Sequence, residues 1–232
     1  MIRPAFLKKG DTVAIVSTAR KISKDELLPA IALLKAWQLN ISIGTTINAS
    51  KNQFAGSDAV RIADFQQALD NPDIAAVWCA RGGYGTVRII DKLDFSHFLK
   101  RPKWIVGYSD VTVLHNALHT LGCETIHATM PINIAENSKA AIASLKNALF
   151  GEKVVYKVPS HPFNRVGFAE GVLVGGNLSI LYSLLGSKSN IDPTGKILFI
   201  EDLDEYLYHI DRMLINLQRN NWFEGLKGLV VG

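Results

Sequence analysis

W-I-V-G-Y-S-D-V-T, residues Trp104–Thr112, is the stretch that decides the fold, because an apolar strand runs directly into a helix. We expect a strand over Trp104–Tyr108 and a helix over Asp110–Leu121, with Ser109 at the turn between them. A serine on such a sharp turn exposes its hydroxyl, and the first free N–H groups of the helix point at the group that it attacks. The usual G-x-S-x-G pattern is absent. Ser109 is therefore either a nucleophile or, together with Asp110, a cap of the helix.

Outward from this stretch, short apolar runs alternate with amphipathic segments, a rhythm typical of parallel strands joined by helices. The predicted strands are Thr12–Ser17, Ile41–Ile47, Ile74–Cys79, Trp104–Tyr108 and Thr125–His127. The predicted helices are one that opens at a Ser23/Glu26 capping box, one capped by Ser57 that runs through Leu69, Val87–Leu93, Asp110–Leu121 and Lys139–Leu149. The pattern predicts an α/β fold with an N-terminal, doubly wound and mostly parallel sheet.

The pattern changes after Gly151, where prolines and a glycine interrupt the chain and a second strand-and-helix rhythm follows. We expect an N-terminal α/β domain over 1–150 that carries the nucleophile, a linker over 151–165 and a C-terminal α/β domain over 166–232. Because the second domain is small and stops on a strand, it is expected to be incomplete, and the chain to be cut off at its C-terminus.

The composition of the chain excludes several classes of protein function. The 232 residues are 48% hydrophobic, with a net charge of +4 from scattered basic residues. This argues against a nucleic-acid partner, which usually requires a basic stripe. Cys79 and Cys123 stand far apart, which favours reduced thiols over a disulfide. The N-terminus lacks a signal-peptide core, and no apolar run reaches the roughly 20 residues of a membrane span. A soluble, cytoplasmic protein without a membrane partner is expected.

A glycine-rich loop, Arg81-Gly82-Gly83-Tyr84-Gly85, follows the strand Ile74–Cys79. Its backbone N–H groups are able to approach a ligand closely. The loop could cradle a phosphate, supply an oxyanion donor or form a plain tight turn, although both G-x-G-x-x-G and G-x-x-x-x-G-K are absent. Because carboxyl ends of parallel strands share one edge of a sheet, this loop and Ser109 are expected to face one site.

Two further segments carry candidate residues. Glu201, Asp202, Asp204 and Glu205 follow a predicted strand, and one of these carboxylates could orient a histidine or merely cap the next helix. The other segment, Gly175-Gly176-Asn177-Leu178, opens a helix whose N-terminus could bind a carboxylate, unless Asn177 only caps it.

None of the histidines is an obvious general base. His115 and His119 have the i, i+4 spacing of a zinc site, but Asn116 stands where H-E-x-x-H requires glutamate, so a structural or solvent-facing pair is favoured. No metal site is predicted. The six histidines are His97, His115, His119, His127, His161 and His209.

Taken together, the motifs resemble those of the LD-carboxypeptidase family of serine peptidases, which includes microcin-immunity hydrolases. The resemblance covers essentially the whole chain. The matching pieces are Phe54-Ala55-Gly56-Ser57-Asp58 with Arg61 and Asp64, Trp78–Gly85, Gly107-Tyr108-Ser109-Asp110-Val111-Thr112, Gly175–Leu178, and Glu201-Asp202 with Tyr208 and Asp211–Leu214. The sequence departs from the family pattern in two places. His127–Met130 stands where H-G-P-M is usual, and Ser17–Arg20 replaces the usual Pro-Ser-rich turn.

The resemblance implies that Ser109 is the nucleophile and that Glu201 orients a histidine. It also implies oxyanion donors from the N–H of Asp110 and of Gly82 or Gly83. The family histidine stands in a later P-x-G-H-type segment, beyond residue 232. The chain is therefore expected to hold two-thirds of a triad and to be inactive by itself.

The activity that the resemblance implies is cleavage of the bond before the terminal D-alanine of murein tetrapeptides, in the bacterial cytoplasm, by a homodimer without metal or cofactor. Arg81, Gly176 and Asn177 are candidates to bind the terminal carboxylate of this small-molecule substrate. Three alternatives stay open: a hydrolase of microcin-like amide antibiotics, a catalytically dead protein that only binds muropeptides, and a nucleotide-binding protein that uses the glycine-rich loop.

Overall fold

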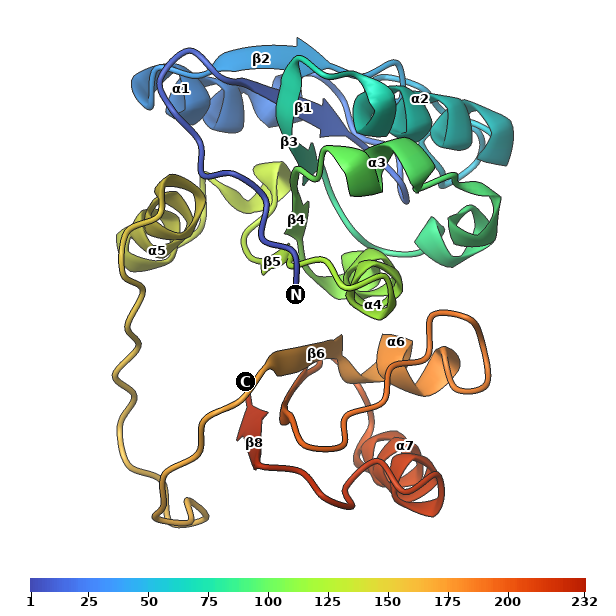
Figure 1. Cartoon of the computed structure of the whole chain (residues 1–232). Coiled ribbons are helices and arrows are strands. Elements are labelled where there is room, and N and C mark those ends of the chain that lie inside the picture. The colour runs from blue at the N-terminus through green and yellow to red at the C-terminus, as the bar shows by residue number, and fades with distance from the viewer.

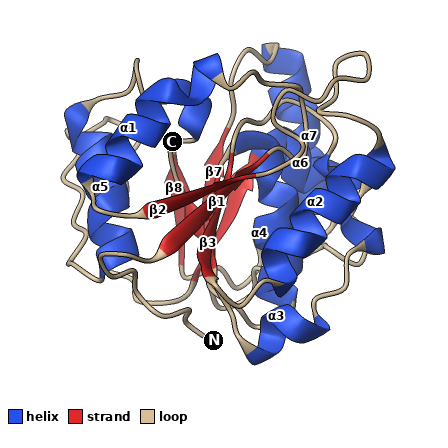
Figure 2. Cartoon of the chain, turned by 90° about the horizontal axis from the view of Figure 1, so that it is seen from above, coloured by secondary structure: helices blue, strands red, loops and turns tan.

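The first half of the chain forms a five-stranded parallel sheet with the strand order β2-β1-β3-β4-β5. The computed structural model describes all 232 residues. The strands are β1 (Thr12–Val16), β2 (Asn40–Ile43), β3 (Ile74–Cys79), β4 (Trp104–Gly107) and β5 (Ile126–His127). The helices are α1 (Leu28–Ala36), α2 (Asp58–Asp70), α3 (Ser96–Lys100), α4 (Thr112–Thr120) and α5 (Lys139–Phe150). Helices α1 and α5 cover one face of the sheet and α2, α3 and α4 the other (Figure 2), so the predicted doubly wound fold is confirmed.

Local capping signals begin α2 and the 3-10 turn Asp25–Leu27 that leads into α1. The Ser23 backbone N–H donates to the Glu26 carboxylate at 2.8 Å, and the Glu26 N–H returns a bond to the Ser23 hydroxyl at 3.3 Å, which is the predicted capping box. Pro29 then falls in the first turn of α1, where its missing N–H costs nothing. The Ser57 hydroxyl accepts the N–H of Val60 and so caps α2 as predicted.

The strand order determines where a ligand is able to bind. From β1 the chain moves outward to β2, then crosses back to β3 on the other side of β1. The loops that follow β1 and β3 therefore diverge at the carboxyl edge of the sheet and leave a crevice between them, which is where open α/β sheets bind ligands. Figure 1 shows β1 and β3 side by side at the middle of this sheet. Ser109 follows the next strand, β4.

The second half of the chain forms a smaller parallel sheet with the order β6-β7-β8. Its elements are β6 (Leu173–Asn177), α6 (Leu178–Ser183), β7 (Ile197–Glu201), α7 (Leu207–Arg219) and β8 (Gly228–Val231). Leu198 and Ile200 of β7 pack into a core with α6 and α7. Phe199 alternates to the opposite face, where its ring meets His127 of β5 at a centroid distance of 5.2 Å. This face turns toward the first sheet.

Residues 152–172 connect the two sheets without a helix or strand, along the open side of the molecule (Figure 1). The predicted domain boundaries at 150 and 166 stay predictions. None of the helices combines the length and hydropathy that a bilayer crossing requires. Both cysteines are buried and free, as predicted.

Candidate active site

Ser109 stands at the abrupt junction between β4 and α4. Its φ is +60°, in the left-handed region that costs a residue with a Cβ about 1–2 kcal/mol. Its side chain is half-buried, and its hydroxyl makes no hydrogen bond within the chain. No side chain caps the 3-10 turn Ser109–Val111 or the α-helix after it, so the helix-cap interpretation is wrong. Backbone strain concentrated at a free hydroxyl is typical of a functional position.

Gly82 packs directly against Ser109. A Cβ on Gly82 would lie 3.1 Å from Ser109 Oγ and 3.4 Å from the backbone nitrogen of Asp110. Any larger residue would therefore fill the space beside the hydroxyl. The N–H groups of Gly82 and Gly83 donate no hydrogen bond within the chain. Unpaired N–H groups next to a nucleophile are what a tetrahedral oxyanion requires. The fold thus brings together the residues that the sequence predicted for the nucleophile and the oxyanion hole.

The Asp110 side chain points away from the hydroxyl and holds the glycine-rich loop in place. Its carboxylate is fully buried and accepts the N–H of Thr86 at 2.9 Å. Burial is the main cause that raises the pKa of Asp110. Because an acidic side chain already occupies the N–H at the end of this loop, a phosphate bound there would meet a competing carboxylate. This geometry argues against the nucleotide-binding alternative.

Glu201 approaches the site from the second sheet. It lies opposite Asn177 in the β6–β7 pair, and the Asn177 N–H donates to the Thr112 hydroxyl, in the first turn of α4, at 3.0 Å. The end of β7 is thereby connected to the helix that follows Ser109. Glu201 Oε1 is buried without a hydrogen-bond partner. Burial, followed by the charge of Asp202, raises the pKa of Glu201. Burial also raises the pKa of Tyr108, with a smaller contribution from the charge of Glu201. A buried carboxylate oxygen without a donor is suited to accept an imidazole N–H.

Gly176 and Asn177 form the joint between the two sheets. A Cβ on Gly176 would lie 2.6 Å from Thr112 Oγ1. The Asn177 amide oxygen caps α6 by accepting the N–H of Ile180 at 3.1 Å, and its amide nitrogen donates to Asp202 at 3.0 Å. Asn177 therefore has a structural task as predicted for a cap, while the substrate-binding role of this pair stays a prediction.

Comparison with known proteins identifies the family. The profile of the LD-carboxypeptidase N-terminal domain matches residues 13–128, and that of the LD-carboxypeptidase C-terminal domain matches residues 170–232. The chain belongs to the LD-carboxypeptidase family. A probable murein peptide carboxypeptidase of Bacillus subtilis is 38% identical over 235 residues, which span 99% of this chain and 74% of that protein.

Solved structures agree with this assignment. The muramoyltetrapeptide carboxypeptidase from Oxalobacter formigenes superposes with a TM-score of 0.84 at 29% identity, over 95% of this chain and 76% of that one. The microcin C7 self immunity protein MccF superposes with a TM-score of 0.89 at 22% identity, over 100% of this chain and 80% of that one, and this shows the shared fold. This member of the LD-carboxypeptidase family is a serine peptidase of the carboxypeptidase type.

Two histidines of this LD-carboxypeptidase are engaged in other contacts. The His115 ring bonds to the Gly107 carbonyl oxygen and to the Thr125 hydroxyl, both at 2.9 Å, and burial lowers its pKa to about 4. His209, on α7, pairs with Glu205, which precedes that helix. No histidine hydrogen-bonds to Ser109 or to Glu201, and the identity of the general base stays a prediction from the resemblance.

Reasoning from the residues gave no role to Arg61, which binds two of the loops that form the site. Its side chain is completely buried, and Nη1 donates to the carbonyl oxygens of Thr18 at 2.5 Å and Gly85 at 2.8 Å. Arg61 thus fastens the loops after β1 and β3 to α2. A signal was present in the sequence, since Arg61 and Asp64 share the inward face of α2 with Phe65, where charged residues are unusual.

Proposed function

We propose that this LD-carboxypeptidase hydrolyses the amide bond before the terminal D-alanine of murein tetrapeptides. Ser109 Oγ bonds to the carbonyl carbon while its proton passes to a histidine, which the resemblance puts beyond residue 232 and Glu201 orients. The N–H groups of Asp110 and of Gly82 or Gly83 stabilise the tetrahedral oxyanion. The C–N bond then breaks and D-alanine leaves with the proton on its amine. Water finally hydrolyses the acyl-serine ester and regenerates the hydroxyl.

The observation that carries this proposal is the strained elbow at Ser109 beside unpaired backbone N–H groups. The φ of +60° aims a free hydroxyl into the space that Gly82 leaves open. The choice of substrate is supported by the relatives, because one is a probable murein peptide carboxypeptidase and another a muramoyltetrapeptide carboxypeptidase. No nucleic acid, membrane or cofactor takes part in the proposed reaction.

We assign the terminal carboxylate of the peptide to Arg81, together with Gly176 and Asn177. Arg81 Nη1 donates to the Lys21 carbonyl oxygen at 3.2 Å, which orients the guanidinium, while Nε is buried without an acceptor. A guanidinium with unused donors suits a carboxylate. The N–H groups of Asp110 and of Gly82 or Gly83 then bind the carbonyl oxygen of the scissile amide, which becomes the oxyanion.

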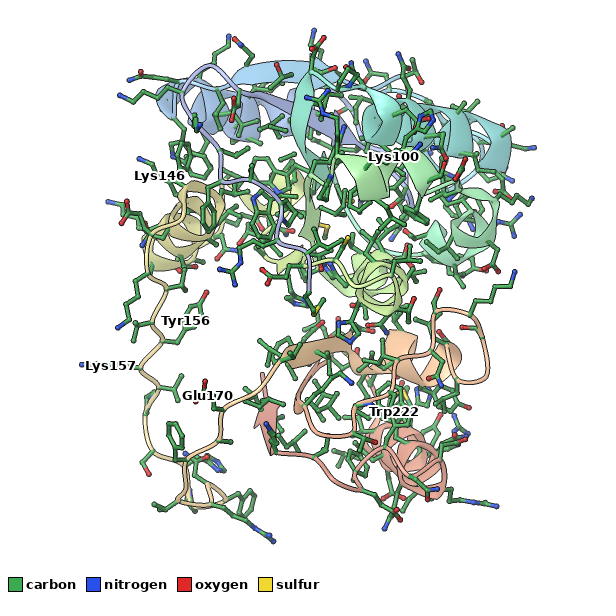
Figure 3. The ribbon with its side chains drawn as sticks, viewed as in Figure 1. Lys100, Lys146, Tyr156, Lys157, Glu170 and Trp222 are labelled. Carbon is green, nitrogen blue, oxygen red and sulfur yellow. The ribbon has the colours of Figure 1, made fainter.

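A cytoplasmic location and a homodimer complete the proposal, and both derive from the family resemblance. The segment that connects the sheets favours association, because it exposes large apolar side chains such as Tyr156, Phe163 and Phe168, at 73%, 88% and 91%. Figure 3 shows Tyr156 and Lys157 on this segment, away from the packed core. Light scattering with size-exclusion chromatography would return twice the 25.5 kDa mass for a dimer, and a single-chain mass would contradict it.

The test of the proposed function is release of D-alanine from murein tetrapeptide by the full-length protein, histidine included, and by its Ser109→Ala variant. Loss of a serine nucleophile lowers kcat by up to about 10⁶-fold. Ser160→Ala, an exposed serine in the connecting segment, is the matched control and should keep wild-type turnover. Undiminished release by Ser109→Ala would contradict the nucleophile assignment. Faster turnover of a microcin-like acyl amide would favour the antibiotic hydrolase, and binding of tetrapeptide without turnover would favour the binding protein.

A further inference from the structure

A polar cavity lies at the crevice between the loops that follow β1 and β3. It has a volume of about 350 Å³, which suits part of a small ligand. Loops from three strands build it at the carboxyl edge of the first sheet. Its lining consists of Arg20, Lys21, Ile22, Ser23, Glu26, Asn48, Ala49, Ser50, Gln53 and Arg81.

Positive charge is in surplus in this cavity. Three cations, Arg20, Lys21 and Arg81, face one carboxylate, that of Glu26. Glu26 is already engaged, since it accepts the N–H and the hydroxyl of Ser23, both at 2.8 Å. These bonds, with a smaller contribution from the charge of Arg81, lower the pKa of Glu26. Arg20 and Lys21 form no ion pair within the chain, so their charges remain available to an anionic ligand.

The cavity walls are fixed by hydrogen bonds. The Ser17 hydroxyl donates to the Arg20 carbonyl oxygen at 2.7 Å, and the Lys21 N–H donates to the Gln53 carbonyl oxygen at 3.0 Å. Arg81 reaches across to the Lys21 carbonyl oxygen. A cationic pocket with fixed walls pays little ordering entropy when it binds a ligand.

The cavity adjoins the nucleophile through two glycines. A Cβ on Gly83 would overlap the aliphatic part of the Arg20 side chain, so Arg20 lies against this glycine. The preceding residue, Gly82, contacts Ser109. Consecutive residues of an extended peptide are roughly 3.5 Å apart, so a substrate group within one or two residues of the scissile bond reaches the pocket.

We propose that this pocket binds a carboxylate of the substrate and that Arg20 is the residue that makes the enzyme specific for it. The inference rests on the proposed function and adds Arg20 to Arg81, which lines the same pocket. Arg20 stands in the Ser17–Arg20 turn, at which the sequence departs from the family pattern. The carboxylate is either the terminal one of D-alanine or a free one on an inner residue of the peptide.

Isothermal titration of the full chain with murein tetrapeptide tests the proposal, in a Ser109→Ala background so that the peptide is not consumed. The peptide is compared with derivatives in which each free carboxylate is converted singly to a carboxamide. Arg20→Gln is the test variant. Lys24→Gln removes an equal charge from an exposed residue nearby that does not line the cavity.

Arg20→Gln should weaken tetrapeptide binding by about 10- to 100-fold, the size of a lost charge-assisted hydrogen bond. With one of the carboxamide derivatives the same substitution should change the Kd by less than about twofold, because the two changes remove one shared interaction. That derivative identifies the carboxylate. Equal effects of Arg20→Gln and Lys24→Gln, an Arg20→Gln effect that persists with every carboxamide, or no binding of the parent peptide would overturn the proposal. Release of D-alanine by the protein with Ser109 intact judges the proposed function separately.

Discussion

Replacing Ser109 by alanine and by glycine separates backbone strain from chemistry at the elbow. Both substitutions remove Oγ, but only alanine keeps a Cβ at the φ of +60°. The left-handed conformation costs a residue with a Cβ about 1–2 kcal/mol, and glycine recovers this at an entropic cost of about 0.5–1 kcal/mol. Ser109→Gly should therefore be more stable than Ser109→Ala by about 0.5–1 kcal/mol, or about 1–4 °C in Tm for a chain of this size.

Urea unfolding followed by tryptophan fluorescence measures this difference, because Trp78 and Trp104 are buried in the core of the first sheet. Both variants should fail to release D-alanine. A glycine variant that unfolds at a lower urea concentration than the alanine variant would refute the strain argument. A lower midpoint would mean that the left-handed conformation at residue 109 carries no strain that glycine relieves.

Three further outcomes follow from the site. In the full-length protein, histidine included, Gly82→Ala should lower kcat/KM by about 10²- to 10³-fold by crowding the oxyanion position, while Gly167→Ala, with open space around its Cβ, should leave it unchanged; equal activities would contradict the oxyanion assignment. Arg61→Leu should cost about 3 kcal/mol in urea unfolding by orphaning buried carbonyl oxygens, whereas Arg88→Leu, which removes an exposed partner of the same Asp58, should cost less than about 1 kcal/mol; similar losses would show that Arg61 holds nothing in place. His115 has its pKa lowered to about 4 by burial, so the unfolded chain takes up the proton first and stability is lost as pH falls from about 6.5 toward 4, by about 1.4 kcal/mol per pH unit; His115→Gln should flatten this part of the pH profile, and an unchanged slope would assign it to other groups.

The strand-to-helix turn at Ser109 could be predicted from the sequence because neighbouring residues determine it. An apolar strand that ends on Gly107, a polar Ser109 and an amphipathic helix leave few other conformations. The capping box at Ser23 and Glu26 and the cap at Ser57 were predictable for the same reason, since each is complete within four residues. The predicted fold class follows from the alternation of such segments.

Features that depend on contacts between distant segments were not predictable in this way. The strand predicted over Ile41–Ile47 ends at Ile43 as β2. The carboxylate of Asp64, on α2, accepts the N–H groups of Thr45 and Thr46 at 2.8 and 2.9 Å and draws the chain out of the sheet. A Cβ on Gly44 would overlap that same carboxylate. Arg61 was overlooked for the same reason, because the backbone oxygens that it binds come from two other loops.

The hydrogen bond to the Thr112 hydroxyl connects the segment that carries Ser109 with the sheet that carries Glu201. This hydroxyl lies three residues after the nucleophile and accepts the N–H of Asn177, the neighbour of Glu201 across the small sheet. Neither half of the molecule alone brings the acid to the serine. On the proposed mechanism, a chain whose halves have not yet docked is therefore chemically silent, and its reactivity depends on the docking of those halves. Such a peptidase would need no inhibitory propeptide to keep it harmless while it folds.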